Sequence, residues 1–359
     1  MTQTRKVETR MARRALIALV ALALVVAACR AVGSSPGAPS GCPTEPPTAA
    51  GACGFTPTTL KVGLGYIPSV QFAQFYLADQ AGYYRDAGLE VTFENKIDPD
   101  LVTLVGQGAL DIGVADGTSV APAVSQGIPI KYVTTIYGTY PSIVFAKASS
   151  GITSAADLEG KTIGIPAKFG SSWIMLQALL NSADLTPDDA EIVTYPDFGQ
   201  GVAVQEGAVD AATGFANNEP VQLELSGAEA VVLHVDDIVP LPGPGLIVGT
   251  AALDAKHDAI AQFQSATLRA MEEIAADPSK GLDAAIVAVP ELASDRATQE
   301  AILEATIATW APPGGDPSDF GAIDRAGWEA TVDLLVTLGI VATPVAVDRL
   351  VAEIGLPVD

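Results

Sequence analysis

From Leu60 onward, short apolar runs alternate along the chain with stretches whose apolar residues recur at helical spacing. A short apolar run bounded by turn residues predicts a buried strand, and apolar residues three or four positions apart predict a helix. Alternation of the two is typical of an α/β fold. The predicted strands are residues 60–64, 89–94, 112–115, 130–136, 143–146, 162–165, 190–195, 211–214 and 245–249. The predicted helices are residues 71–81, 99–106, 118–126, 172–182, 199–206, 258–276, 282–287, 297–309 and 324–338.

The order of these elements occurs twice, with matching short motifs. Gly108-Ala109-Leu110-Asp111 precedes one predicted strand, and Gly207-Ala208-Val209-Asp210 precedes another about a hundred residues later. Lys61-Val62-Gly63-Leu64 and Lys161-Thr162-Ile163-Gly164 each lead into a loop and a helix. Such internal similarity predicts two related α/β units. The alternative is chance similarity in a chain rich in Gly and Ala.

We interpret the two units as doubly wound lobes that face each other across a crevice. Lobe 1 is expected to comprise residues 59–145 and 245–359, and lobe 2 residues 146–244. The strands 143–146 and 245–249 carry the chain between the lobes and are the expected hinge. Ligands bind at strand-end loops in open α/β sheets, so the loops that face the crevice form the candidate site.

The first 28 residues have the pattern of a secretory signal peptide. Five basic side chains precede the apolar run 15–26, which is too short to cross a bilayer comfortably. The run ends in Val26-Ala27-Ala28-Cys29, which resembles the bacterial lipobox, so Cys29 is expected to be acylated and to become the mature N-terminus. Acyl chains contribute about 0.8 kcal/mol per buried CH₂ and favour a firm membrane anchor. The alternative is a plain cleaved signal with an incidental cysteine.

The rest of the chain is strongly acidic. The whole sequence has a formal net charge of −23, and residues 1–28 carry +4, so the remainder carries −27. This charge argues against nucleic acid and anionic lipid as partners, because phosphate binding needs clustered lysines and arginines.

Residues 29–58 are rich in Pro, Gly, Ser and Thr and predict a flexible linker after the lipidated cysteine. Cys42 and Cys53 lie in this linker, and a disulfide between them is expected in an exported protein, the alternative being that they stay unpaired. No cysteine follows Cys53. The folded region therefore has no cysteine nucleophile, iron–sulfur cluster or cysteine-ligated zinc.

Candidate ligand-binding residues follow the predicted strands of lobe 1. Tyr66 is suited to stacking on a flat ring, and Ser69 offers a hydroxyl group. Asp116 can accept hydrogen bonds from ligand hydroxyl or ring N–H groups, or can simply cap the following helix. Tyr137 and Tyr140 precede the first expected hinge strand, where they either stack on the ligand or pack at the lobe junction.

Lobe 2 supplies two further candidate loops. The first contains Phe169, Gly170, Ser171, Ser172 and Trp173. Its N–H groups and serines suit an anion or a carbonyl, and its rings suit an aromatic plane. The alternative role of the tryptophan is packing in the lobe core.

The second loop contains Asn217, Asn218 and Glu219. Asparagine amides both donate and accept, which matches the uracil-like edge of a flavin or the edge of an aminopyrimidine. The four candidate loops are residues 66–69, 116–119, 168–173 and 215–219, and Lys168 is the one basic side chain among them. We therefore expect a neutral planar heterocycle with hydroxyl groups rather than nitrate or a sulfonate.

Several longer motifs carry a family resemblance: residues 65–69, 81–91, 108–113, 157–164, 217–220 and 236–240. In these motifs, from Thr59 to Ile340, the chain resembles the periplasmic solute-binding proteins of ABC importers. The branch concerned includes binders of nitrate, sulfonates, thiamine-pyrimidine precursors and riboflavin. Residues 217–220 and 236–240 are most similar to the riboflavin and pyrimidine-precursor binders.

The resemblance implies a type II periplasmic-binding-protein fold and a function in vitamin import. The expected ligand is riboflavin, with a thiamine-pyrimidine precursor as the alternative, and the expected partner is an ABC permease. The protein is expected to be a monomer without a cofactor, held by its lipid on the extracellular or periplasmic side of the cell membrane.

Two other function classes remain open. A related eukaryotic branch of the same fold makes the thiamine pyrimidine at a histidine- and cysteine-rich site. Here only His234 and His257 are present, both interpreted as packing or surface residues, and there is no P-loop, no metal-ligand histidine spacing and no Gly-x-Ser-x-Gly motif. We therefore expect no catalytic residue and no metal site. A ligand-sensing lipoprotein that signals through a partner fits the sequence as well as an importer component does.

Overall fold

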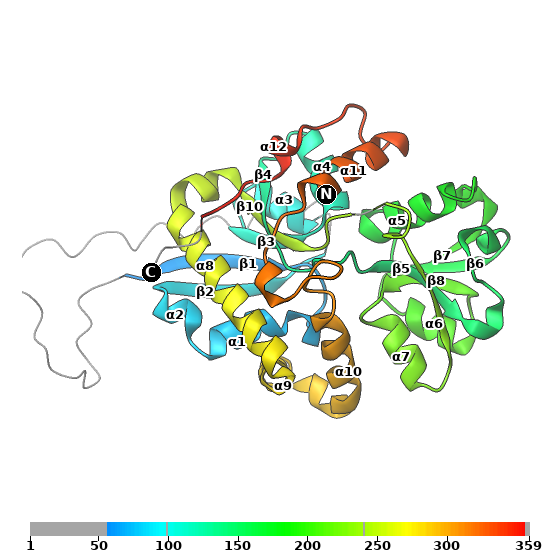
Figure 1. The fold of residues 1–359 in the computed structure, drawn as a ribbon, viewed down its shortest axis with the longest axis horizontal. Coiled ribbons are helices and arrows are strands. Elements are labelled where there is room, and N and C mark those ends of the chain that lie inside the picture. Colours follow the sequence, from blue (N-terminus) through cyan, green and yellow to red (C-terminus); the bar gives the residue numbers. More distant parts are fainter. Residues whose placement is uncertain (1–55, 98–99, 240, 356–359) are drawn as a thin grey trace, which may run out of the picture. The chain divides into compact units, whose positions relative to one another are not determined.

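The computed structural model describes residues 56–97, 100–239 and 241–355, which belong to one unit of the chain, residues 54–359 (Figure 1). The predicted signal peptide, the acylated Cys29 and the paired Cys42 and Cys53 lie outside the described residues and stay predictions. None of the helices in the described part of the chain has the length and apolar character that a bilayer crossing requires.

Five strands form the first sheet, in the order β2-β1-β3-β10-β4. Their bounds are β1 (Thr58–Leu64), β2 (Leu89–Asn95), β3 (Ile112–Ala115), β4 (Ile130–Thr135) and β10 (Gly245–Gly249). β1 pairs in parallel with β2 and β3, whereas β10 runs antiparallel to β3 and β4. Every residue of β3 and β10 is buried, which explains their uninterrupted apolar sequences.

The second sheet has the order β7-β6-β8-β5-β9. Its strands are β5 (Ser142–Lys147), β6 (Thr162–Ile165), β7 (Glu191–Thr194), β8 (Ala211–Phe215) and β9 (Ala230–His234). β6 pairs in parallel with β7 and β8, and β5 runs antiparallel to β8 and β9. The two sheets therefore have the same topology, which confirms the prediction of a bilobal α/β fold. We call the elements around the first sheet the first lobe and those around the second sheet the second lobe.

The repeated Gly-Ala-x-Asp motif has the same structural role in each lobe. Gly108 and Gly207 both have a φ of 74°, a left-handed conformation that suits glycine at the end of a helix. Asp111 then accepts a hydrogen bond from the backbone N–H of Lys61 in β1 (2.9 Å). Asp210 accepts the equivalent bond from Thr162 in β6 (2.8 Å). The sequence repeat thus reflects two units built in the same way.

The chain passes between the lobes twice, between β4 and β5 and again between β9 and β10. β5 and β10 themselves each lie inside a sheet, with paired strands on both sides. The crossings are therefore the segments that precede these strands, and the expected lobe boundary at residue 145 falls within a strand of the second sheet. Because β5 and β10 each move with their own sheet, a rotation of one lobe against the other would take place in the segments that precede them. Tyr140 in one crossing donates its backbone N–H to Asp236 Oδ2 in the other (3.1 Å).

Helices cover both sheets. The helices of the first lobe are α1 (Ala73–Gln80), α2 (Tyr83–Asp86), α3 (Asp100–Gly106), α4 (Gly117–Ser125), α8 (Thr250–Ala276), α9 (Pro278–Ala288), α10 (Arg296–Ile307), α11 (Arg325–Thr337) and α12 (Val347–Leu350). Those of the second lobe are α5 (Gly170–Asn181), α6 (Gln200–Glu206) and α7 (Glu219–Leu225). Short 3-10 helices are η1 (Val70–Phe72), η2 (Ala148–Ser150), η3 (Ala155–Leu158), η4 (Pro187–Asp189), η5 (Pro290–Asp295) and η6 (Pro317–Asp319). As predicted, the chain after β10 is mostly helical.

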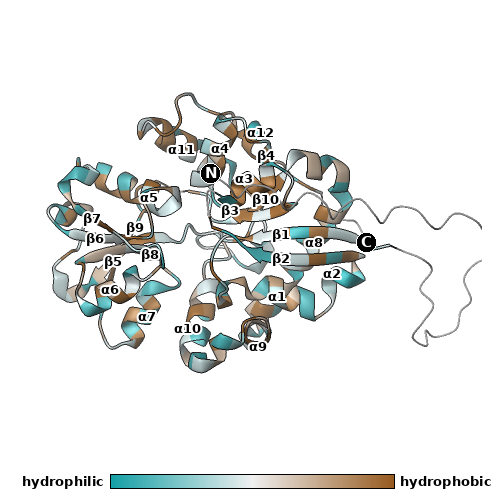
Figure 2. Cartoon of the chain, turned by 180° about the vertical axis from the view of Figure 1, so that it is seen from behind, coloured by the Kyte–Doolittle hydropathy of each residue, from teal (hydrophilic) through white to brown (hydrophobic). Residues whose placement is uncertain are grey.

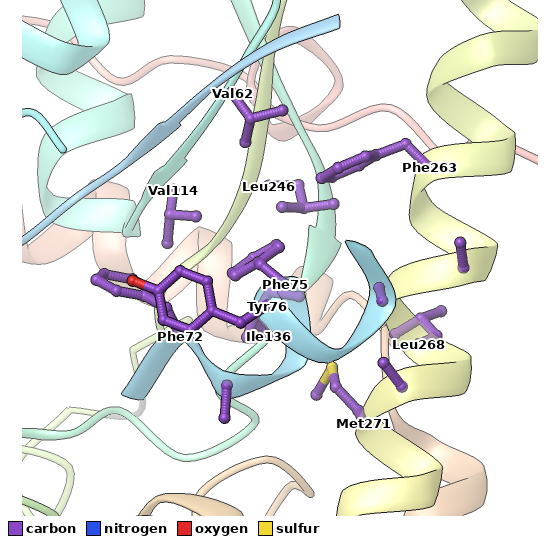
Figure 3. Close-up of a cluster of buried hydrophobic side chains, with 14 of the residues drawn as sticks. Val62, Phe72, Phe75, Tyr76, Val114, Ile136, Leu246, Phe263, Leu268 and Met271 are labelled. Atoms are coloured by element: carbon purple, nitrogen blue, oxygen red, sulfur yellow. The ribbon is translucent and has the colours of Figure 1, made fainter. Parts of the chain in front are cut away.

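An apolar core joins the first sheet to α1 and α8. Val62 of β1, Leu246 of β10, Phe75 of α1 and Phe263 of α8 point toward one another in this core (Figure 3). The rings of Phe263 and Tyr84 stack with centroids 4.8 Å apart. Apolar residues also dominate β5 and β10, whose brown ribbons in Figure 2 mark the interiors of the two sheets. This packing fixes the strand ends that carry the site.

Candidate functional site

A cavity of about 640 Å³ lies between the loops at the strand ends of the two lobes. The first lobe and the crossings contribute residues 65–68, 71–72, 95–97, 100, 114–116, 137 and 244. The second lobe contributes residues 166–167, 169–172, 196, 198, 200, 214–215 and 218–219. The cavity thus lies where open α/β sheets place their ligands, beyond the carboxyl ends of the parallel strands.

Most of the residues predicted from sequence line this cavity. They are Tyr66, Asp116, Tyr137, Phe169, Gly170, Ser171, Ser172, Asn218 and Glu219. They come from both lobes and from positions up to about 150 residues apart, and the fold brings them to one surface. Their contact with a ligand stays a prediction.

Four predicted residues lie outside the cavity wall. Ser69 caps η1 by accepting the N–H of Gln71 (3.3 Å). Tyr140 is buried in an apolar cluster with Met175 and Val235, and Trp173 packs against the core of the second lobe. These two side chains have the packing roles that the sequence left open as alternatives.

Asn217, the fourth, is buried behind the wall. Its amide donates to Thr306 Oγ1 of α10 (2.8 Å) and to Gln71 Oε1 (3.4 Å). Because α10 belongs to the first lobe and Asn217 follows β8, this amide connects the lobes and holds the cavity-lining Gln71. Its position favours an indirect role in the site.

Asp116 is a buried carboxylate at the start of α4, with 4% of its surface exposed. Its Oδ1 accepts the backbone N–H groups of Thr118 (2.9 Å) and Ser119 (3.2 Å) and the Thr118 hydroxyl (2.6 Å). Its Oδ2 accepts the hydroxyl of Ser171 from α5 (2.6 Å), so this bond spans the two lobes. Burial raises the pKa of Asp116, while these hydrogen bonds act in the opposite direction.

Glu219 begins α7 and reaches back to the end of β8. Its Oε2 accepts the backbone N–H of Phe215 (2.8 Å). Burial raises the pKa of Glu219 to about 7, because this hydrogen bond compensates only in part for lost hydration. Burial, with a smaller contribution from nearby Glu219, raises the pKa of the Tyr66 hydroxyl, and a hydrogen bond with the Asn218 side chain acts in the opposite direction.

Aromatic rings from both lobes meet at the cavity. Tyr66 of the first lobe contacts Phe198 of the second edge to face, with ring centroids 5.0 Å apart and an interplanar angle of 84°. Tyr137 lines the wall from a crossing, and Phe169 lines it from the loop before α5, where 58% of its surface is exposed. These rings provide the flat apolar surfaces that a planar ligand requires.

Sequence reasoning missed several lining residues, among them Phe72, Lys96, Phe198 and Gln200. Gln200 is only 2% exposed, and its Oε1 has no hydrogen-bond partner within the described part of the chain. Lys96 and Phe198 follow β2 and β7, so applying the strand-end rule to every parallel strand identifies them. Phe72 and Gln200 lie in η1 and α6, and no sequence signal marks them.

The cavity wall carries few charges. Among its described residues, Lys96 is the one cation, and its Nζ lies 3.7 Å from a carboxylate oxygen of Glu94. Asp100, Asp116 and Glu219 are the acidic side chains of the wall. Within the described ranges, no group of three or more His, Cys, Asp or Glu side chains is arranged to hold a metal ion.

Comparison with known proteins finds similarity in sequence and in fold. The family model described as "NMT1/THI5 like" matches residues 69–281. The riboflavin-binding protein RibY of Chloroflexus aurantiacus is 33% identical over 313 residues, which cover 86% of this chain and 89% of RibY. The 4-amino-5-hydroxymethyl-2-methylpyrimidine phosphate synthase THI13 of Saccharomyces cerevisiae is 25% identical over 65% of this chain and 72% of its own.

Among solved structures, the alkanesulfonate-binding protein SsuA of Xanthomonas axonopodis pv. citri aligns with a TM-score of 0.65. The alignment covers 83% of this chain and 99% of SsuA at 19% identity, so it shows a common fold. The family model spans more than half of the chain, and RibY is similar over nearly its whole length. The chain therefore belongs to the NMT1/THI5-like family and has the bilobal periplasmic-binding-protein fold.

Proposed function

We propose that this protein is the extracytoplasmic solute-binding component of an ABC importer and that it captures riboflavin between its lobes. The observation that carries the proposal is the cavity wall, which combines aromatic rings from both lobes with amide and hydroxyl groups and few charges. Its volume of about 640 Å³ lies within the range of about 300–1,000 Å³ typical of sites for ligands of this size. The similarity to RibY supports the same ligand.

The tricyclic ring system would be held by stacking. Tyr66 and Phe198 already contact each other across the cavity, and Tyr137 and Phe169 lie on its wall. Each aromatic pair contributes about 0.5–1.5 kcal/mol beyond the area it buries. The amides of Asn218 and Gln200 line the cavity and can pair with the polar edge of the ring, since Gln200 Oε1 has no hydrogen-bond partner among the described residues.

The ribityl chain would be held by hydroxyl and carboxyl groups. Ser171, Ser172, Asp116 and Glu219 line the cavity and belong to both lobes. A hydroxyl group both donates and accepts, so it can pair with serines as well as with carboxylates. A ligand bound to both lobes favours the closed arrangement, which excludes water and creates the surface that a permease recognises.

The same proposal sets the location and the partners of the protein. The lipobox-like segment 26–29 favours a lipid anchor at Cys29 on the outer side of the cell membrane. The importer's permease and the vitamin are the proposed partners, the protein acts as a monomer, and riboflavin is cargo rather than a cofactor.

The chain is a binding protein and not an enzyme, although the family includes pyrimidine phosphate synthases. All three cysteines of the sequence precede β1, so the cavity has no thiol. An aminopyrimidine related to the synthase product is the second candidate ligand. Glu219 and Asn218 favour it, because a carboxyl and an amide side by side pair well with an amino group and a ring nitrogen.

Titration of the purified chain, unfolded and refolded to remove bound ligand, tests the proposal. Riboflavin should bind one to one, and the bound flavin should lose most of its fluorescence through stacking. If flavin fluorescence is unchanged while 4-amino-5-hydroxymethyl-2-methylpyrimidine raises the Tm, the ligand is the pyrimidine. If neither compound binds, the proposed vitamin-binding function is wrong.

A further inference from the structure

The N-termini of two helices meet at Asp116. Its carboxylate accepts two backbone N–H groups from the first turn of α4, Thr118 at 2.9 Å and Ser119 at 3.2 Å. Its other oxygen accepts the hydroxyl of Ser171 (2.6 Å), the second residue of α5. Residues 170–172 of α5 also line the cavity. One carboxylate therefore lies at the positive ends of two helix dipoles, one from each lobe.

A helix N-terminus that faces a cavity normally attracts a ligand anion such as phosphate, sulfonate or carboxylate. Here the carboxylate of Asp116 already lies where such an anion would bind. Burial raises the pKa of Asp116, and the two N–H groups and two hydroxyls that donate to it act in the opposite direction and favour its charged form. A second anion at this place would meet a like charge in a buried setting, where repulsion is stronger than in water.

The other charged side chains of the cavity wall do not compensate for the negative charge of Asp116. Lys96 is accompanied by Glu94 at 3.7 Å, and no arginine is among the described residues of the wall. Asp100 and Glu219 add acidic groups to the wall. The cavity is thus poor in the cations that recognise phosphate.

We infer that Asp116 is a specificity-determining residue that excludes phosphorylated ligands, so that the site takes only the neutral, dephosphorylated heterocycle. This inference rests on the proposed function and refines its ligand class. Phosphorylated forms outside the cell would first need hydrolysis by water, which breaks the phosphomonoester bond and gives the free alcohol and inorganic phosphate. A phosphomonoester hydrolase is therefore the class of enzyme that supplies this ligand.

The first experiment compares riboflavin with its 5′-phosphate, FMN, on the wild-type chain. We expect FMN to bind at least 30-fold more weakly. Binding of FMN within threefold of riboflavin overturns the inference but leaves the proposed function intact. If riboflavin itself does not bind, the same comparison is made with the aminopyrimidine and its phosphate ester, which separates failure of the inference from failure of the riboflavin proposal.

The second experiment uses Asp116→Asn, which removes the charge and keeps an oxygen to cap α4. The ratio of the two dissociation constants should fall at least tenfold, because the repulsion between Asp116 and a phosphate at the α5 N-terminus is removed. Asp277→Asn is the matched control, since Asp277 caps α9 outside the cavity. In this variant the ratio of the FMN and riboflavin dissociation constants should equal that of wild type. Asp116→Ser, with another capping side chain, serves if the first variant does not fold. A ratio within twofold of wild type in the folded variant overturns the role of Asp116.

Discussion

Glu219 is a carboxyl group that is buried in the cavity wall beside the Tyr66 hydroxyl. Its pKa of about 7 means that it changes charge near neutral pH, whereas an exposed glutamate is charged well below that pH. The cause is burial, and backbone hydrogen bonds, the larger from Phe215, reduce the effect without removing it. The charge of one residue in the site is therefore coupled to the stability of the fold.

Glu219→Gln should make the protein more stable at alkaline pH. The folded state raises the pKa of Glu219, so this residue lowers stability as the pH rises from about 4.5 to about 7 and costs a constant amount above that. Glutamine keeps an oxygen for the Phe215 N–H but never ionises. Urea denaturation at pH 5 and pH 8 should show the variant's advantage growing by about 2 to 3 kcal/mol. An advantage that is the same at both pH values contradicts a raised pKa.

Phe198 and Phe169 both line the cavity from the second lobe, but their surroundings differ. Phe198 contacts Tyr66, whereas more than half of Phe169 is exposed. Phe198→Ala should therefore weaken riboflavin binding by about 1 kcal/mol or more, roughly fivefold, and Phe169→Ala should weaken it less. Fluorescence titration of the two variants in parallel gives the comparison. Equal losses would mean that contact between Tyr66 and Phe198 does not shape the ligand platform.

At the scale of the elements, β10 completes the first sheet after the chain has returned from the second lobe. Its first residue, Gly245, lies so close to β4 that an added Cβ atom would be 2.2 Å from the carbonyl oxygen of Thr134. The nearest atoms include backbone, which cannot move as a side chain can. The position of β10 beside β4 is thus fixed by close packing of the two backbones.

Gly245→Ala should destabilise the protein by about 3 kcal/mol or more, because β10 must shift away from β4 to accommodate the methyl group. Gly355→Ala is the control, since a Cβ atom there meets nothing within 4 Å and should change stability little. Chemical denaturation of both variants provides the measurement. A loss below about 1 kcal/mol for Gly245→Ala would show that the two strands separate easily.

At the scale of the whole described unit, polar contacts connect the lobes on either side of the cavity. Ser171 donates to Asp116, and Asn217 donates to Thr306 of α10. Together with the contact between Tyr66 and Phe198, these bonds favour the closed arrangement. Ligand affinity depends on how strongly closure is favoured, because the ligand binds best to the closed form.

Ser171→Ala should weaken binding of riboflavin about three- to tenfold, since it removes the hydroxyl that bonds Asp116 and lies 3.5 Å from Ser119 Oγ in the other lobe, a loss of about 1 kcal/mol. It keeps the Asp116 carboxylate itself, so the ratio between FMN and riboflavin should change less than in Asp116→Asn. Ser182→Ala is the control at the other end of α5, where the hydroxyl bonds only the carbonyl of Leu179. Unchanged affinity in Ser171→Ala would mean that this bond does not contribute to closure.

The sequence by itself determined the class of the fold and its two related lobes. Strands and helices arise from local periodicity, so every predicted strand was found, and β9 is a described strand that was not predicted. β9 is a half-buried edge strand, although its sequence, Ala-Val-Val-Leu-His, is as apolar as those of the predicted strands. The motif with Asp111 and Asp210 marked the repeat because each aspartate bonds its own unit.

The sequence also identified much of the cavity wall, because parallel strands end at one edge of a sheet and their loops are recognisable. Only the tertiary structure decided which side chains of those loops face the cavity. It placed Asn217 and Trp173 behind the wall and brought Gln200 and Phe198 onto it. It also decided that Asp116 meets Ser171. The physical reason is that these orientations depend on packing between lobes that are far apart in sequence, which local periodicity does not encode.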